Sequence, residues 1–152
     1  MAQKALNLED IVAGNIIQTK GIGSMTWLKD GERYSRLENN KQTGGTDIVA
    51  YRAKDNSREV IIPSSLLTDK STGRPIPVRS VSWSADNEKV LIYNNTRRVW
   101  RYDTRGDYWV LNLKDGALRQ LGKGMPESSM MFAKFSPDGT RVAYVSNNNI
   151  YV

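Results

Sequence analysis

One arginine, Arg101, stands between two aromatic residues, Trp100 and Tyr102, in a segment whose composition favours a β-strand. A guanidinium keeps its positive charge and presents several fixed N–H donors, so Arg101 could hold a carbonyl or carboxylate oxygen in a partly dry cavity. The same pattern is typical of a surface arginine that lies against an aromatic ring and binds no ligand. The residues alone leave both interpretations open.

The chain contains no histidine and no cysteine. A Ser-His-Asp triad needs an imidazole to take the proton of the serine, and thiolate catalysis, disulfides and cysteine-ligated metal sites need a thiol. The sequence also lacks a Gly-x-Ser-x-Gly elbow, a Walker-type phosphate loop and any histidine-based metal motif. We therefore expect no catalytic residue, no metal ligand set and no cofactor within these 152 residues.

The formal charge of +6 is compatible with a nucleic-acid partner, because clustered cations gain from counterion release. The densest basic stretch holds four arginines: Arg97, Arg98, Arg101 and Arg105. Asp103 and Asp107 interrupt it, so we expect a solvated basic surface and no nucleic-acid partner. Residues 105–107 also spell Arg-Gly-Asp, which we expect to be a chance match in a hairpin loop.

The hydrophobic fraction of 39% and the charged fraction of 25% are typical of a soluble globular protein. No stretch approaches the roughly 18 consecutive apolar residues that a membrane span needs. Residues 1–4 lack the apolar core of a secretory leader. We therefore expect no membrane span in this chain, and a leader that was either removed or never present.

A short unit recurs three times: a strand that ends in an aromatic residue, followed by a turn that contains an aspartate. The aromatic residues are Trp27, Trp83 and Phe135, and the aspartates are Asp30, Asp86 and Asp138. The aspartate can accept hydrogen bonds from nearby backbone amides, and Gly139 suits the exit of its turn. We expect the three aromatic residues to pack between stacked sheets.

Each unit continues into segments rich in β-branched and aromatic residues, which predict further strands. These are residues 33–37, 47–51 and 60–62, then 89–93, 108–113 and 117–121, then 141–145 and 149–152. The Asp115-Gly116 pair predicts a hairpin turn within the second unit. Four antiparallel strands that repeat about every 50 residues are typical of propeller blades.

The expected fold class is therefore all-β: a β-propeller fragment with two four-stranded antiparallel blades and most of a third, in a ring that is not closed. We take residues 1–152 as one partial N-terminal propeller domain. It divides into a leading segment (about 1–23), blade one (24–62), a connection (63–78), blade two (79–122) and an incomplete blade three (130–152). Residues 7–12 predict a helical turn, and the connection is expected to be flexible or locally helical around Leu66 and Leu67. An interrupted stack has unpaired edges, so we expect self-association or limited disorder of the isolated piece.

Several segments together resemble the N-terminal propeller region of the dipeptidyl peptidase IV family and indicate a bacterial member. They are residues 6–11, 27–31, 99–102, 107–111, 135–139, 142–145 and 149–152. The specific part is Val99-Trp100-Arg101-Tyr102, because Ser-Pro-Asp-Gly turns occur in many propellers.

The resemblance implies an eight-bladed propeller followed by an α/β-hydrolase domain, in a serine exopeptidase that removes dipeptides or tripeptides after Pro or Ala. In the matching family segment, the arginine after the tryptophan points into the cavity and hydrogen-bonds a backbone carbonyl of the substrate, and here that residue is Arg101. The paired glutamates that bind the free amino terminus have no counterpart in this chain, and neither has the catalytic triad. The propeller would thus gate and orient peptide N-termini, and this chain alone would be inactive.

The resemblance also implies partners and a compartment. The partners are peptides with Pro or Ala near the N-terminus, the rest of the propeller, the hydrolase domain and a further copy of the protein, and the location is periplasmic, secreted or cell-envelope. The alternative is a non-catalytic propeller, TolB-like or WD-like, that serves as an interaction module, because such turn motifs suit it equally well. A downstream glutamate pair and a Gly-x-Ser-x-Gly elbow would decide for the peptidase.

Overall fold

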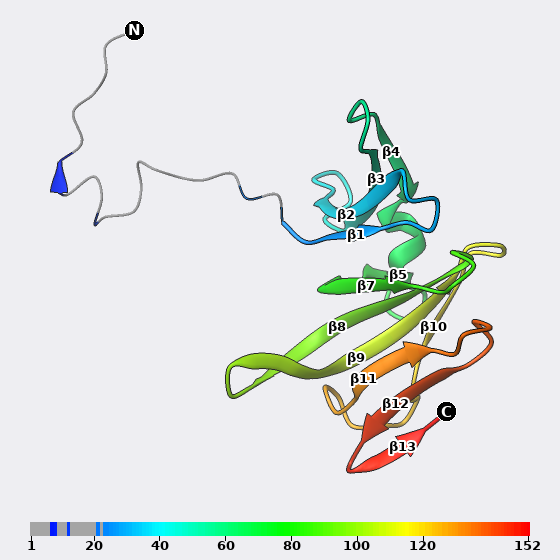
Figure 1. Cartoon of the computed structure of the whole chain (residues 1–152). Coiled ribbons are helices and arrows are strands. Elements are labelled where there is room, and N and C mark those ends of the chain that lie inside the picture. Colours follow the sequence, from blue (N-terminus) through cyan, green and yellow to red (C-terminus); the bar gives the residue numbers. More distant parts are fainter. Residues whose placement is uncertain (1–6, 9–11, 13–20, 22) are drawn as a thin grey trace, which may run out of the picture.

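The computed structural model describes residues 7–8, 12, 21 and 23–152, and nearly all of its regular elements are β-strands. The strands form three larger antiparallel sheets, stacked in chain order from the top to the bottom of Figure 1. The predicted all-β class is confirmed, and the described strands do not close into a ring. The helical turn predicted at residues 7–12 falls mostly outside the described residues.

Two of the sheets have four strands each. Sheet one has the order β1 (Met25–Trp27), β2 (Arg33–Asn39), β3 (Thr46–Arg52) and β4 (Arg58–Ile62). Sheet two contains β7 (Ser80–Trp83), β8 (Lys89–Val99), β9 (Tyr102–Asn112) and β10 (Ala117–Gln120). Every neighbouring pair is antiparallel, so consecutive strands meet through hairpins, as the spacing of turn residues predicts.

Sheet three has three strands: β11 (Met131–Phe135), β12 (Val142–Ser146) and β13 (Asn149–Tyr151). Asn147 and Asn148 both have positive φ, 49° and 61°, in the two-residue loop between β12 and β13. Asparagine tolerates this left-handed conformation better than most residues, which suits a tight hairpin.

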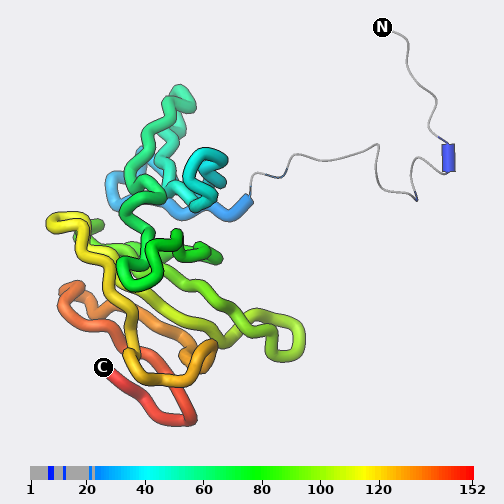
Figure 2. The backbone as a smooth tube through the Cα atoms, turned by 180° about the vertical axis from the view of Figure 1, so that it is seen from behind, coloured from blue at the N-terminus to red at the C-terminus, as the bar shows by residue number. Residues whose placement is uncertain are grey.

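The connection between the first two sheets contains a 3-10 helix, η1 (Ser64–Leu67), and the two-stranded ribbon β5 (Thr68–Asp69) and β6 (Arg74–Pro75). Figure 2 shows the connection, in green, running between the first two sheets. The locally helical structure expected around Leu67 is confirmed. Leu67 is fully buried and Ile76 is 6% exposed, so the connection is part of the core and not a flexible linker.

Successive sheets bury aliphatic side chains against each other. Ile48 and Ile62 of sheet one pack with Val90, Ile92 and Leu111 of sheet two, and all five are fully buried. A second cluster joins sheet two to sheet three; its buried members are Leu91, Tyr108 and Met130. Full burial of one such side chain contributes roughly 1.5–3 kcal/mol, so the stack depends mainly on these contacts between sheets.

The repeated turn has the same hydrogen bond in all three sheets. The side chains of Asp30, Asp86 and Asp138 each accept the backbone N–H two residues later, at 3.0 Å. In sheets two and three, a serine hydroxyl also donates to the aspartate, and it is the main reason why the pKa of Asp86 and that of Asp138 fall to about 2. The prediction that aspartate organises the turn is confirmed.

The expectation that three aromatic residues pack between sheets is confirmed for two of them. Trp83 packs against the core between sheets one and two, and its Nε1 donates to Ser35 Oγ at 3.2 Å; Phe135 packs between sheets two and three. The expectation is wrong for Trp27, which is 57% exposed. Trp27 lies beside Tyr34 on the opposite face of sheet one from Ser35, and no described sheet covers that face.

Candidate functional site

The β8–β9 hairpin carries the segment singled out in the sequence. Both strands have 11 residues, and Trp100 and Arg101 form the loop that joins them. The hairpin projects from the stack at the left of Figure 1. The expectation that Arg101 lies in a strand is wrong, because Arg101 is a loop residue. The regular strand patterns covered residues 89–93 and 108–113, and the low β-propensity of Asn94 and Asn95 hid the extension of the first strand.

A cavity of about 630 Å³ opens beside this hairpin. Its walls come from β7, β8, β9 and the residues that precede sheet one, and the side chains used below are Arg79, Tyr93, Arg98, Arg101, Tyr102 and Asp103. Arg101 thus borders a cavity from the tip of an extended arm. Arg98 borders the same cavity, although no sequence pattern distinguishes Arg98 from its neighbour Arg97.

The charges around the cavity are only partly compensated. Arg79 Nη2 lies 3.3 Å from Asp103 Oδ2, and the Tyr93 hydroxyl donates to the Asp103 carbonyl at 3.1 Å. Among the described residues, neither Arg98 nor Arg101 has a carboxylate partner; Arg98 donates to the Arg101 carbonyl at 3.4 Å. Two guanidinium groups are therefore available to an acceptor in the cavity.

Tyr93 supplies a neutral hydroxyl to this wall. Burial, with smaller contributions from Tyr108 and the Asp103 carboxylate, raises the pKa of Tyr93 to about 12. The hydroxyl therefore remains protonated at neutral pH and keeps its hydrogen bond to the β9 backbone.

The structure distinguishes the two chemical interpretations of Arg101 in one respect. Arg101 is exposed, Trp100 is 93% exposed and Tyr102 is 74% exposed. The arginine-on-ring contact found among the described residues is Arg36 over Tyr51, at 5.7 Å, and not Arg101 on either neighbour. The stacked arrangement of a surface arginine is therefore not observed at Arg101.

The acids that interrupt the basic stretch in the sequence do not neutralise it in space. Asp103 pairs with Arg79, and Asp107 is only 6% exposed, with hydrogen bonds to Asn95 and Ser128. The four arginines of the hairpin are all exposed. The Arg-Gly-Asp tripeptide was expected in a loop, and this is wrong: residues 105–107 lie inside β9, and Gly106 and Asp107 are buried.

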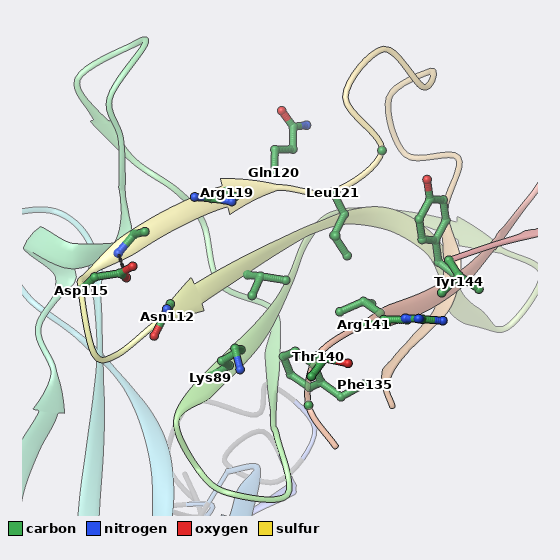
Figure 3. Close-up of a pocket in the computed structure, with 16 residues that line it drawn as sticks. Lys89, Asn112, Asp115, Arg119, Gln120, Leu121, Phe135, Thr140, Arg141 and Tyr144 are labelled. Atoms are coloured by element: carbon green, nitrogen blue, oxygen red, sulfur yellow. Dashed lines mark hydrogen bonds between the residues drawn. The ribbon is translucent and has the colours of Figure 1, made fainter. Parts of the chain in front are cut away.

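A second cavity, of about 800 Å³, lies between sheets two and three. Figure 3 shows Leu121 and Phe135 on its walls together with Lys89 and Arg141. Asp115 accepts the backbone N–H of Ala117 at 2.9 Å, so its carboxylate holds the hairpin turn. The gap combines apolar walls with dispersed cations and lacks a grouping suited to proton transfer, and we assign no chemistry to it.

Two further features bear on the kind of site. Within the described part of the chain, no three residues of the metal-ligating types histidine, cysteine, aspartate and glutamate lie close enough together to hold an ion. A search of the same residues finds no helix long and apolar enough to cross a membrane.

Comparisons with known proteins agree on one region of one family. Residues 84–152 match the model of the dipeptidyl peptidase IV (DPP IV) N-terminal region. The probable dipeptidyl-aminopeptidase B of Aspergillus oryzae is 27% identical over 124 residues, which cover 81% of this chain and 13% of that protein. The dipeptidyl aminopeptidase B of Saccharomyces cerevisiae is 27% identical over 152 residues, 93% of this chain and 17% of that protein.

The fold has a counterpart among crystal structures. Dipeptidyl peptidase 4 of Porphyromonas gingivalis matches with a TM-score of 0.69 and 22% identity, over 99% of this chain and 20% of that chain. The chain therefore spans 13% to 20% of the length of these relatives.

Proposed function

Because the chain belongs to the dipeptidyl peptidase IV family, whose N-terminal region it matches, we propose that it forms the first blades of the propeller of a serine exopeptidase. In this proposal the propeller admits peptide N-termini and orients them for an α/β-hydrolase domain that cleaves after Pro or Ala. The domain division given above is part of the same proposal. The rest of the propeller and the hydrolase domain are then partners of this chain.

The observation that carries the proposal is the position of Arg101. Its guanidinium stands at the tip of a projecting hairpin, beside a cavity, with no carboxylate partner among the described residues. Such a group can donate to a peptide carbonyl and cannot be deprotonated near neutral pH. Arg101 is the substrate-binding residue of the proposal.

One charge-assisted hydrogen bond contributes roughly 1.5–3 kcal/mol, which corresponds to about a 10- to 100-fold effect on kcat/KM if the bond persists in the transition state. We expect Arg101→Ala to lower kcat/KM by this factor in the complete peptidase, measured with a chromogenic Xaa-Pro substrate. Arg101→Lys should lie between wild type and Arg101→Ala, because lysine keeps the charge but not the planar fork of donors.

Arg97→Ala is the matched control. It removes the same charge from the same hairpin, and Arg97 is exposed but does not line the cavity. If Arg97→Ala and Arg101→Ala have equal kinetics, Arg101 has no role in substrate binding.

The chain by itself should not hydrolyse the same substrate, since it has no imidazole to move the serine proton. Turnover that co-purifies with the chain through several columns would contradict this part of the proposal.

A secreted, periplasmic or cell-envelope location and association with a second copy complete the proposal, and both follow from the family resemblance. Fractionation of the native cells checks the location, and sedimentation of the purified protein checks the association.

A further inference from the structure

The base of the β8–β9 hairpin is held by one buried carboxylate. Asp107 Oδ2 accepts the Asn95 side-chain N–H at 2.7 Å, and Asp107 Oδ1 accepts the Ser128 backbone N–H at 2.8 Å. The Ser128 hydroxyl donates to the Asn95 carbonyl at 2.6 Å and closes the triangle. We call these three residues the hairpin clasp. The clasp joins both strands of the hairpin to the segment that leads into sheet three.

A backbone bridge next to the clasp connects it to the core. Gly106 N donates to the Met130 carbonyl at 3.0 Å, and Met130 N donates back at 3.1 Å. Met130 is 1% exposed and belongs to the cluster between sheets two and three. The hairpin clasp is therefore connected to the packed core between sheets two and three.

The strand register breaks at the clasp. The pairing of β8 with β9 shifts between Asn94 and Arg97, and Asn95 has a φ of 42°. Such bulges redirect a strand and increase its local twist. The direction in which the hairpin leaves the sheet is thus decided at the residue that Asp107 binds.

Sheet one contains the same arrangement of hydrogen bonds around a buried aspartate, but without a long hairpin beyond it. Asp47 occupies the matching register position, is 8% exposed, and accepts Asn40 Nδ2 at 3.0 Å and Ser64 N at 2.7 Å. Beyond it the chain makes only the short turn of residues 40–45. The two sheets therefore share one connection between a strand end and the next segment, but only the second carries a long hairpin with Arg101 at its tip.

Because the β8–β9 hairpin is long, a small rotation at its base displaces its tip by a large distance. The five residue-to-residue steps from Asp107 to Tyr102 span roughly 17 Å at about 3.3 Å per step. A rotation of about 10° at the base would move the tip by about 3 Å, which breaks a hydrogen bond, and a misplacement of about 1 Å can already cost about 100-fold in rate.

We propose that Asp107 is a positioning residue: through Asn95 and Ser128 it sets the direction of the β8–β9 hairpin and so places Arg101 at the cavity. The role of Arg101 rests on the proposed function, whereas the fastening of the hairpin does not. The experiment has one arm for each part.

The first arm uses this chain alone and measures hydrogen exchange. Asp107→Asn keeps the shape but replaces one acceptor oxygen with an N–H₂ group that faces donors, so amide exchange across residues 95–105 should rise about tenfold or more. Asp47→Asn is the matched control: it should accelerate exchange around residues 40–45 and leave the hairpin unchanged. Equal exchange of the hairpin in wild type and Asp107→Asn would overturn the clasp.

If Asp107→Asn does not fold, Asn95→Gly removes one donor of the clasp and suits the positive φ. It should raise exchange in the same residues, by a smaller factor. Unchanged exchange in this folded variant would equally overturn the proposal.

The second arm measures kcat/KM in the complete peptidase. Asp107→Asn should lower kcat/KM by about tenfold and Asp47→Asn by less than about twofold, at a temperature where both remain folded. The kcat/KM of the double variant Asp107→Asn/Arg101→Ala should be within about twofold of that of Arg101→Ala. If Asp107 acts only by placing the Arg101 side chain, its substitution has no further effect once that side chain is removed.

The outcomes separate the two ideas. If Arg101→Ala has no effect on kcat/KM, the proposed function fails, and hydrogen exchange still decides whether Asp107 holds the hairpin. If Arg101→Ala is impaired but Asp107→Asn is not, or if the effects of Asp107→Asn and Arg101→Ala multiply in full, Asp107 does not position Arg101.

Discussion

Gly106 lies where two strands and a tyrosine ring meet, and it has no room for a side chain. A Cβ atom built at Gly106 would fall 2.7 Å from the Asn94 carbonyl oxygen and closer still to the Tyr93 ring. Asn94 is paired with Asp107 in the ladder, and the Tyr93 hydroxyl is bonded to the Asp103 carbonyl, so neither neighbour can move without loss of a contact. We therefore expect Gly106→Ala to strain the base of the hairpin.

The magnitude follows from the kind of atom involved. Overpacking of a filled interior costs about 1–3 kcal/mol, and the upper half of that range applies here because one clash is with backbone. A change of 1 kcal/mol shifts the Tm of a domain of about 150 residues by roughly 2–4 °C, so a loss of about 2–3 kcal/mol corresponds to roughly 4–12 °C. Urea unfolding followed by tryptophan fluorescence measures the free energy, because Trp109 lies on β9.

Two further variants make the test specific. Gly21→Ala is the control, since the nearest atom to its new Cβ is 4.0 Å away, and it should leave the free energy of unfolding unchanged. Tyr93→Ala in the Gly106→Ala background removes one of the two clashes, so the added cost of Gly106→Ala should be smaller there than in wild type. A Gly106→Ala variant as stable as Gly21→Ala would refute the close packing of the hairpin base.

Three other predictions concern the turns, the core and the charge of the hairpin. Ser84→Ala removes the main cause of the low pKa of Asp86, so NMR should show Asp86 of the variant titrating at a higher pH than in wild type. A lowered carboxylate pKa stabilises the fold above the unfolded value near 3.8, and this stability is lost as the pH falls towards 2; the free energy of unfolding of the variant should therefore depend less on pH between about 4 and 2. Ile92→Ala should lower the free energy of unfolding by about 2–5 kcal/mol in urea, against about 0.5 kcal/mol or less for the 39% exposed Val60→Ala; equal losses would refute the stacked core. If the complete protein is the peptidase proposed above, a peptide with Glu beyond the cleavage site should have a kcat/KM about two- to fivefold above that of its Lys analogue at low salt. Arg98→Gln should reduce this ratio, and a ratio of one in wild type would count against a cationic cavity.

The sheets were predictable from sequence because their signals are local. An aromatic residue at a strand end, an aspartate three residues later and a residue suited to positive φ specify a strand and a turn without any distant partner, and the three copies at Trp27, Trp83 and Phe135 reinforced one another. The absence of histidine likewise excludes a Ser-His-Asp triad within these residues, whatever fold they adopt.

The candidate site was less predictable because its residues depend on distant partners. Arg101 was singled out by family resemblance, but Arg98 and the cavity emerged only when β7, β8 and β9 were placed together. The pairing of Asp47 with Ser64 and of Asp107 with Ser128 left no periodic signal, since each bond joins residues far apart in the chain.

The residues alone predict an all-β chain of repeated antiparallel units that contains no imidazole for catalysis. The stacking of the sheets leaves Trp27 exposed and Trp83 packed, and it buries Gly106 and Asp107 of the Arg-Gly-Asp tripeptide but not Arg105. It also engages the interrupting acids elsewhere, so that the arginines of the hairpin have no carboxylate partner among the described residues. The physical reason is that strand and turn formation depend on neighbours within a few residues, whereas burial and charge pairing depend on which surfaces meet when the sheets stack.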